Sequence, residues 1–187
     1  MTSIVDHIDA AITATGRIVD AIPADRLPAP TLCEKWDVRT ELNHLVGGMR
    51  IFAAELTATD PGGEHESDWL AADHHAAYRT AATLDRAAWH RPDALTGTVR
   101  LGFGPVPGTL AAMIHLTEVL VHGMDLAVAI DREDLIDQRA ATDLLEILRD
   151  NDFDAFRQPG MFGPAVELAA VAPAHRRLLA FTGREQL

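Results

Sequence analysis

The segment Ala111–Ile130 decides the fold class, and it reads AAMIHLTEVLVHGMDLAVAI. Apolar side chains surround its helical circumference, which is typical of a buried helix or of a membrane span. Four ionisable residues nevertheless lie within it, namely His115, Glu118, His122 and Asp125. At about 100° per residue they fall within an arc of about 80°. The segment therefore predicts an internal helix that carries a single polar stripe.

The polar stripe needs partners, because burying carboxylates and imidazoles alone costs several kcal/mol. A hydrogen-bond network or a metal ion would satisfy it. Glu118 and His122 stand at i and i+4, close enough to bind one ion from a single helix face. Asp125 either holds an imidazole in place or pairs with an arginine. His115 is interpreted either as a site residue or as a core-edge histidine bonded to the backbone.

Proline and glycine clusters divide the rest of the chain into segments of about 15–25 residues, the length of bundle helices. Asp37 is a suitable N-cap for the second helix. The segment Leu95–Phe103 is expected to form a short hairpin at most. Helices are expected over Ser3–Ala21, Val38–Ala58, Ser67–His90, Pro107–Ile130 and Leu135–Phe156, with a short one over Ala174–Phe181. The pattern predicts one all-α domain over residues 1–187, a helical bundle with one long crossover.

Composition and charge narrow the function classes. The chain has 31 alanines against ten aromatic residues, which favours helices, and a net charge of −12. This charge would repel phosphate backbones and anionic lipids, so neither a nucleic acid nor a membrane is an expected partner. The other segments are also too polar to supply a second membrane span. The single cysteine, Cys33, excludes an internal disulfide. Together with an N-terminus unlike a signal peptide, it predicts a cytoplasmic protein.

Several motifs resemble the DinB-like superfamily. The chain is similar in particular to the actinobacterial branch built on the metal-binding N-terminal domain of mycothiol-dependent maleylpyruvate isomerase. The resemblance covers nearly the whole chain. Its main motifs are TLCEKWDVR (Thr31–Arg39), LNHLVGG (Leu42–Gly48) and EVLVHGMDLA (Glu118–Ala127), and the branch's ending resembles Phe162–Pro164, Arg177–Ala180 and Thr182–Arg184.

The resemblance implies a DinB-like four-helix bundle with a long crossover and a metal site formed by His44, Glu118 and His122. Two nitrogen ligands and one oxygen ligand leave open positions, as in catalytic sites for divalent ions. Zinc is the first expectation, and nickel or another divalent ion is the alternative. The resemblance alone selects His44, which lies about 130° from the centre of the apolar stripe of its helix.

The same resemblance implies mycothiol, a low-molecular-weight thiol, as cosubstrate. Coordination would produce a thiolate, which would attack an unidentified electrophile in a transferase or isomerase reaction. Asp125 or His115 would accept the thiol proton or orient His122. Two alternatives remain open: a non-catalytic metal-binding or structural protein, and a metal-dependent hydrolase. A homodimer is a further option.

Two departures from the family affect these expectations. Met124 stands where the family commonly has tryptophan, so the shape of the pocket is expected to differ. The separate C-terminal domain of the full isomerase is not present in the sequence, so maleylpyruvate isomerase activity itself is not expected. Cys33 is interpreted as a structural thiol, with a nucleophile as the alternative. Trp36 is expected to anchor its loop in the core.

A few other residues draw attention. His74 and His75 are expected on the surface, with side chains pointing about 100° apart. The pair Gly47–Gly48 would permit close approach of a helix or a ligand, or would interrupt the helix. Three arginines could receive an anionic substrate: Arg50, Arg79 and Arg100.

Overall fold

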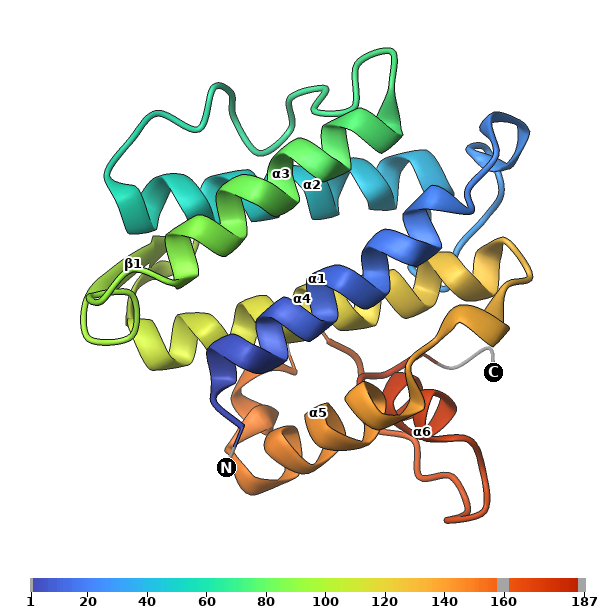
Figure 1. Cartoon of the computed structure of the whole chain (residues 1–187). Coiled ribbons are helices and arrows are strands. Elements are labelled where there is room, and N and C mark those ends of the chain that lie inside the picture. The colour runs from blue at the N-terminus through green and yellow to red at the C-terminus, as the bar shows by residue number, and fades with distance from the viewer. Residues whose placement is uncertain (1, 158–161, 185–187) are drawn as a thin grey trace.

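Four long helices form the bundle that the sequence predicts, in a computed structural model that describes residues 2–157 and 162–184 (Figure 1). α2 and α3 run in the same direction, so the connection between them, residues 58–73, crosses the length of the bundle. This connection is the predicted long crossover. The four helices are α1 (Ile4–Asp20), α2 (Val38–Thr57), α3 (His74–Trp89) and α4 (Gly108–Ala129).

Capping side chains set where the helices begin. The Asp37 carboxylate accepts a hydrogen bond from the Thr40 amide, so α2 starts where the sequence predicts. The start of α3 differs from the prediction of Ser67. Asp73 caps this helix by accepting from the Ala76 amide, and the preceding residues belong to the crossover.

α4 is the central helix of the bundle. It is long and apolar enough to cross a membrane, but 83% of its most apolar 18-residue stretch is buried inside the protein. Gly123 allows α1 to approach α4 closely, because a Cβ there would clash with the Thr15 side chain. The Thr15 hydroxyl donates a hydrogen bond to the carbonyl of Val119, at 3.1 Å. α1 is thus fixed against α4 at the residue that follows His122.

A small antiparallel hairpin precedes α4. Its strands are β1 (Thr98–Leu101) and β2 (Gly104–Pro107), with Val99 opposite Val106. Both valines are buried beneath the end of the bundle. The predicted extended segment therefore exists but lies further along the chain, and Phe103 is in its turn.

Two shorter helices, α5 (Gln138–Asp150) and α6 (Ala174–Phe181), pack on each other beside α4. The predicted helix Leu135–Phe156 is shorter than expected. The Asp137 carboxylate caps α5 at its start, and the chain beyond Asp150 forms a separate 3-10 turn.

The prediction for His74 and His75 was wrong. Both Nε2 atoms lie 3.1 Å from the carbonyl oxygen of Ile22, and the two rings are 4.0 Å apart. The carbonyl of Ile22, just beyond the end of α1, faces the first turn of α3, and both half-buried histidines turn toward it.

Candidate metal centre

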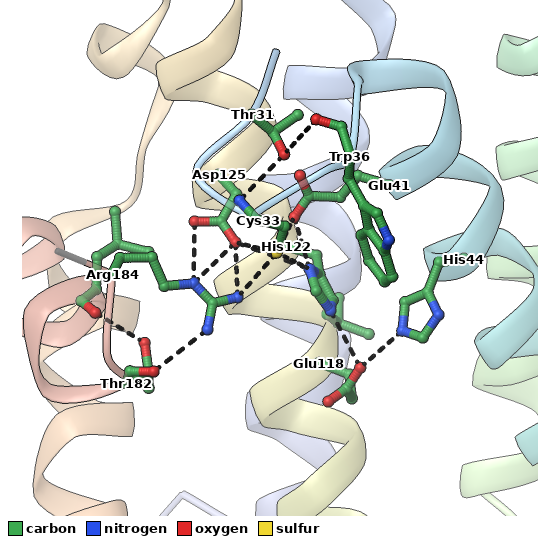
Figure 2. A network of polar contacts seen from close by, with 12 residues as sticks. Thr31, Cys33, Trp36, Glu41, His44, Glu118, His122, Asp125, Thr182 and Arg184 are labelled. Carbon is green, nitrogen blue, oxygen red and sulfur yellow. Dashed lines mark hydrogen bonds and ion pairs between the residues drawn. The ribbon is translucent and has the colours of Figure 1, made fainter. Parts of the chain in front are cut away.

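His44 of α2 faces Glu118 and His122 of α4 across the bundle (Figure 2). His44 Nε2 lies 3.1 Å from Glu118 Oε2, and His122 Nε2 lies 3.2 Å from the same oxygen. The three ligand atoms lie within 4.8 Å of one another. The structure thus brings together the three residues that the sequence motifs single out.

Asn43, the neighbour of His44 in the chain, fixes this part of α2. Its side-chain oxygen accepts from the Trp69 amide at 2.8 Å, and its amide donates to the Ser67 carbonyl at 2.9 Å. One residue of the Asn-His pair therefore holds the crossover, and the next residue points into the cluster.

Glu41, which sequence reasoning missed, orients His122. Its Oε1 accepts a hydrogen bond from His122 Nδ1 at 2.6 Å, and its side chain is fully buried. A carboxylate on one ring nitrogen fixes the imidazole so that the other nitrogen faces the site. The position of Glu41 in the sequence could have revealed it, because this carboxylate lies one turn after Val38 and one turn before Leu45, on the buried face of α2.

Asp125 pairs with Arg184, as one of the two interpretations of this carboxylate expected. The Arg184 guanidinium donates to Asp125 Oδ2 through Nη2 at 2.8 Å and through Nε at 3.1 Å. The Cys33 thiol lies beside this pair, with Sγ 3.6 Å from Asp125 Oδ2 and 3.4 Å from Glu41 Oε1. Arg184 follows α6, so the C-terminal segment meets α4 and the loop before α2 here.

The environment shifts the pKa values of this cluster. Burial acts to raise the pKa of Glu118, but hydrogen bonds from His122 and His44 hold it well below its usual range. Burial acts to lower the pKa of His122, yet its contacts with Cys33, Glu118 and Glu41 raise it well above the ordinary value. Burial and the charge of Glu41 raise the pKa of Asp125 to about 7 despite Arg184. The carboxylates of Glu41, Glu118 and Asp125 thus lie close enough for each to be stabilised by the same positively charged groups.

Burial also raises the pKa of the Cys33 thiol, which keeps this group protonated near neutral pH. The thiolate is the nucleophilic form of cysteine, so this environment favours the structural interpretation of Cys33.

His115 lies apart from the cluster. Its Nε2 donates to Asp85 Oδ2 at 2.7 Å, and both side chains are buried. The rings of Phe52 and Trp89 pack on the imidazole, with centroids at 4.6 and 5.3 Å. The partner of His115 is therefore a carboxylate on α3, whereas the sequence suggested the backbone or the site.

A cavity of about 470 Å3 opens on one side of the cluster, where His44, Glu118 and His122 form part of its wall. Cys33, Trp36 and Arg184 are among its other lining residues. The expectation that Trp36 anchors the core was wrong. Its ring is half-buried and lies 4.9 Å from that of His44, because the loop before α2 places it at the cavity.

The three arginines considered from the sequence lie in different places. The Arg50 guanidinium lies over the Trp69 ring at 5.1 Å, and Arg79 pairs with Asp20 at 3.6 Å. Arg100 lines a second cavity, described below. The arginine of the first cavity, Arg184, was not among the candidates.

Comparison with known proteins identifies the family. Residues 8–127 match the family model described as the mycothiol maleylpyruvate isomerase N-terminal domain. The chain belongs to this family. Two uncharacterized Mycobacterium tuberculosis proteins, from two strains, are each 30% identical over 164 residues, covering 87% of this chain and 87% of theirs.

The crystal structure of the mycothiol-dependent maleylpyruvate isomerase has the same fold as this family member. The match has a TM-score of 0.56 at 15% identity, and a mutant of that enzyme matches at 0.54 and 16%. The match to the isomerase covers 74% of this chain and 66% of the isomerase chain. The likeness confirms the predicted fold.

The donor set of the cluster fits a divalent ion. The raised pKa of His122 keeps a proton between its Nε2 and Glu118, and a bound cation would take the place of that proton while Nδ1 still donates to Glu41. Two imidazole nitrogens and a carboxylate oxygen that converge in this way need a proton or a cation between them. A site of two histidines and one glutamate is also known for catalytic zinc.

A second group could also hold an ion by distance alone. Cys33, Glu41, His122 and Asp125 offer ligand atoms within 4.8 Å of one another. The Arg184 guanidinium, however, already neutralises Asp125 and lies 3.5 Å from Cys33 Sγ. This fixed positive charge disfavours a cation, so the first group is the better candidate for a metal site.

Proposed function

We propose that this protein binds a divalent ion through His44, Glu118 and His122 and uses it in a thiol-dependent transferase or isomerase reaction. Zinc is the first candidate, followed by nickel or another divalent ion. Mycothiol is the proposed cosubstrate and the cytoplasm the proposed compartment. The observation that carries the proposal is the convergence of the three side chains at the wall of an open cavity.

The bound ion would supply acidity, since coordination to a dication converts a thiol to a thiolate at neutral pH. The chain's own residues would hold the reactants. Glu41 would keep His122 Nε2 directed at the site through the 2.6 Å bond to Nδ1. Trp36 would form an apolar wall beside His44, since its ring lies 4.9 Å from the imidazole.

The name of the solved isomerase supports the choice of thiol, because that enzyme is mycothiol-dependent. The cavity chemistry agrees with a polar thiol. Arg184 and Thr182 line the side of the cavity that the C-terminal segment provides, and Glu34 lines it from the loop before α2. Hydrogen-bonding groups around a largely preformed pocket are suited to a hydrophilic small molecule.

The first test is elemental analysis of protein purified without a chelator or a metal column. We expect near-stoichiometric zinc or nickel in the parent protein and its loss in His44→Ala, Glu118→Gln and His122→Ala. Helical content by circular dichroism should stay largely intact. His90→Ala is the matched control, because His90 is an exposed histidine paired with Asp9 away from the cluster.

Unchanged metal content in the three variants would exclude these residues as ligands. If metal binds, calorimetric titration with mycothiol then tests the thiol step. Thiol binding that depends on the metal supports the enzyme proposal. Metal binding without thiol binding would instead support a structural role, and hydrolysis of esters without thiol would support a hydrolase.

A further inference from the structure

A second cavity of about 430 Å3 lies on the other side of the cluster, between α2, α4 and the hairpin. His44 and Glu118 line both cavities. These two side chains therefore form a partition, and the candidate centre can be reached from two directions.

The chemistry of the second cavity differs from that of the first. Its lining consists mainly of apolar side chains from both helices, among them Met49, Phe52, Ile114 and Val119. Its polar lining groups are His115 and the shared pair His44 and Glu118 on the helices, with Arg100 from the hairpin and His65 from the crossover. A mainly apolar cavity of this size with a few polar groups is typical of a small-molecule site.

Gly48 borders this cavity and has open space beside it. A Cβ added at Gly48 would meet no atom within 4 Å, whereas one at Gly47 would clash with the Trp69 ring. Packing thus explains Gly47 but not Gly48. A glycine inside a helix costs about 1 kcal/mol relative to alanine. The open space beside Gly48 belongs to the second cavity, so a large side chain at this position would extend into it, whereas a methyl group would leave most of the space free.

Phe103 lies at the edge of the same cavity, in the turn of the hairpin, and 58% of its surface is exposed. Covering an exposed phenylalanine with an apolar ligand removes apolar surface from water and is therefore favourable. The lining and this side chain both favour an apolar occupant.

We propose that the second cavity binds the apolar ring or chain of a small molecule whose polar end reaches His44 and Glu118. That molecule is the electrophilic reactant of the proposed thiol chemistry, and this assignment rests on the proposed function. The thiol and the electrophile then approach the centre from opposite cavities.

The first experiment measures the cavity itself and does not require metal. The probe is N-phenyl-1-naphthylamine, a neutral apolar dye that fluoresces in apolar sites. We expect saturable binding to the parent protein and to Gly48→Ala, with dissociation constants within threefold of each other. Gly48→Phe fills the cavity and should weaken binding at least tenfold. Leu32→Gln alters the first cavity and should leave dye binding unchanged.

The second experiment tests the link to the centre. Octanohydroxamate and acetohydroxamate share a metal-binding end, and only the former has an apolar chain. In the zinc-loaded protein we expect octanohydroxamate to bind at least tenfold more tightly by calorimetry. Gly48→Phe should remove this difference, whereas Gly48→Ala should retain it.

Equal affinities of the two hydroxamates would overturn the inference. Dye binding that is unchanged in Gly48→Phe but weaker in Leu32→Gln would overturn it as well. Metal content measured in the same variants separates the two proposals. Normal zinc with no effect of Gly48→Phe refutes this inference and leaves the proposed function standing. Absence of zinc refutes the proposed function and the electrophile assignment, whereas the dye still reports on the cavity.

Discussion

Helix α4 carries two histidines that meet carboxylates in opposite surroundings. Among the described residues, the His115 imidazole has one hydrogen-bond partner, Asp85; the rings of Phe52 and Trp89 pack on the imidazole, which also borders the second cavity. His122 meets Glu41 and Glu118 within hydrogen-bond distance and Asp125 at 3.7 Å, at the wall of a cavity.

The difference teaches that the polar stripe of α4 contains two kinds of site. One imidazole with one carboxylate forms a single hydrogen-bonded pair in the core, although Asp85 Oδ1 has no hydrogen-bond partner among the described residues. The His122 cluster places Glu41 and Glu118 on the two nitrogens of one imidazole, so a proton or a cation between Nε2 and Glu118 stabilises it. The elements opposite α4 decide which kind forms, since α3 supplies Asp85 and α2 supplies Glu41 and His44.

The largest effect is expected when the pair of Asp85 and His115 is broken. Asp85→Ala leaves His115 buried without its partner, and we expect a loss of about 3–5 kcal/mol in the free energy of unfolding. Urea denaturation measures this loss, and metal content per folded protein should stay unchanged. The double variant Asp85→Leu with His115→Leu should recover much of the stability. A single-variant loss below about 1 kcal/mol would show that the pair is not structural.

A smaller effect is expected in the open cluster. Glu41→Gln keeps the size of the side chain but weakens its hold on His122 Nδ1. We expect metal affinity to fall about 10–100-fold with little change in helical content. Competition with a chelating dye measures the affinity. Glu55→Gln, at a surface position of the same helix, is the matched control, and an equal loss there would refute an orienting role for Glu41.

The smallest effect concerns a third carboxylate–histidine contact, near the surface. Glu133 accepts hydrogen bonds from His175 at 2.8 Å and from Arg176 at 2.7 Å, and these contacts outweigh burial and lower its pKa. A carboxylate with a lowered pKa in the folded state stabilises the protein above about pH 4.5 and loses this contribution as the pH falls.

Glu133→Gln should therefore flatten the dependence of stability on pH below about pH 4.5, with an effect under about 1 kcal/mol because the side chain is partly exposed. Thermal unfolding across pH 3–6 measures it, where the pH range is about that of carboxylate titration. A slope identical in both proteins would show that the contact contributes nothing.

The sequence predicts α4 and its stripe well, because a run of apolar residues with four ionisable residues on one face has few other solutions. It does not reveal what faces the stripe. The resemblance to the family selects His44, whereas the periodicity of α2 places it at the edge of the buried face. Asp85 lies on another helix, and no local pattern pairs it with His115.

The contribution of the C-terminal segment is the hardest part to predict. Arg184 reaches Asp125 only because α6 packs against α4, and a contact between residues 59 positions apart leaves no local signal. Helix ends are missed for a simpler reason. Asp73 and Asp137 compete with other capping residues nearby, and the packing of the crossover and of the segment before α5 decides between them.

The bond between Asn43 and the crossover has a consequence for solvent exchange. The Trp69 amide donates to Asn43, and His44 is the next residue of the same helix. Freeing the crossover releases this amide to solvent and loosens the turn that carries His44. The deuterium-exchange rate of the Trp69 amide thus reports how often the crossover separates from the turn of α2 that carries His44, without any ligand having to be observed.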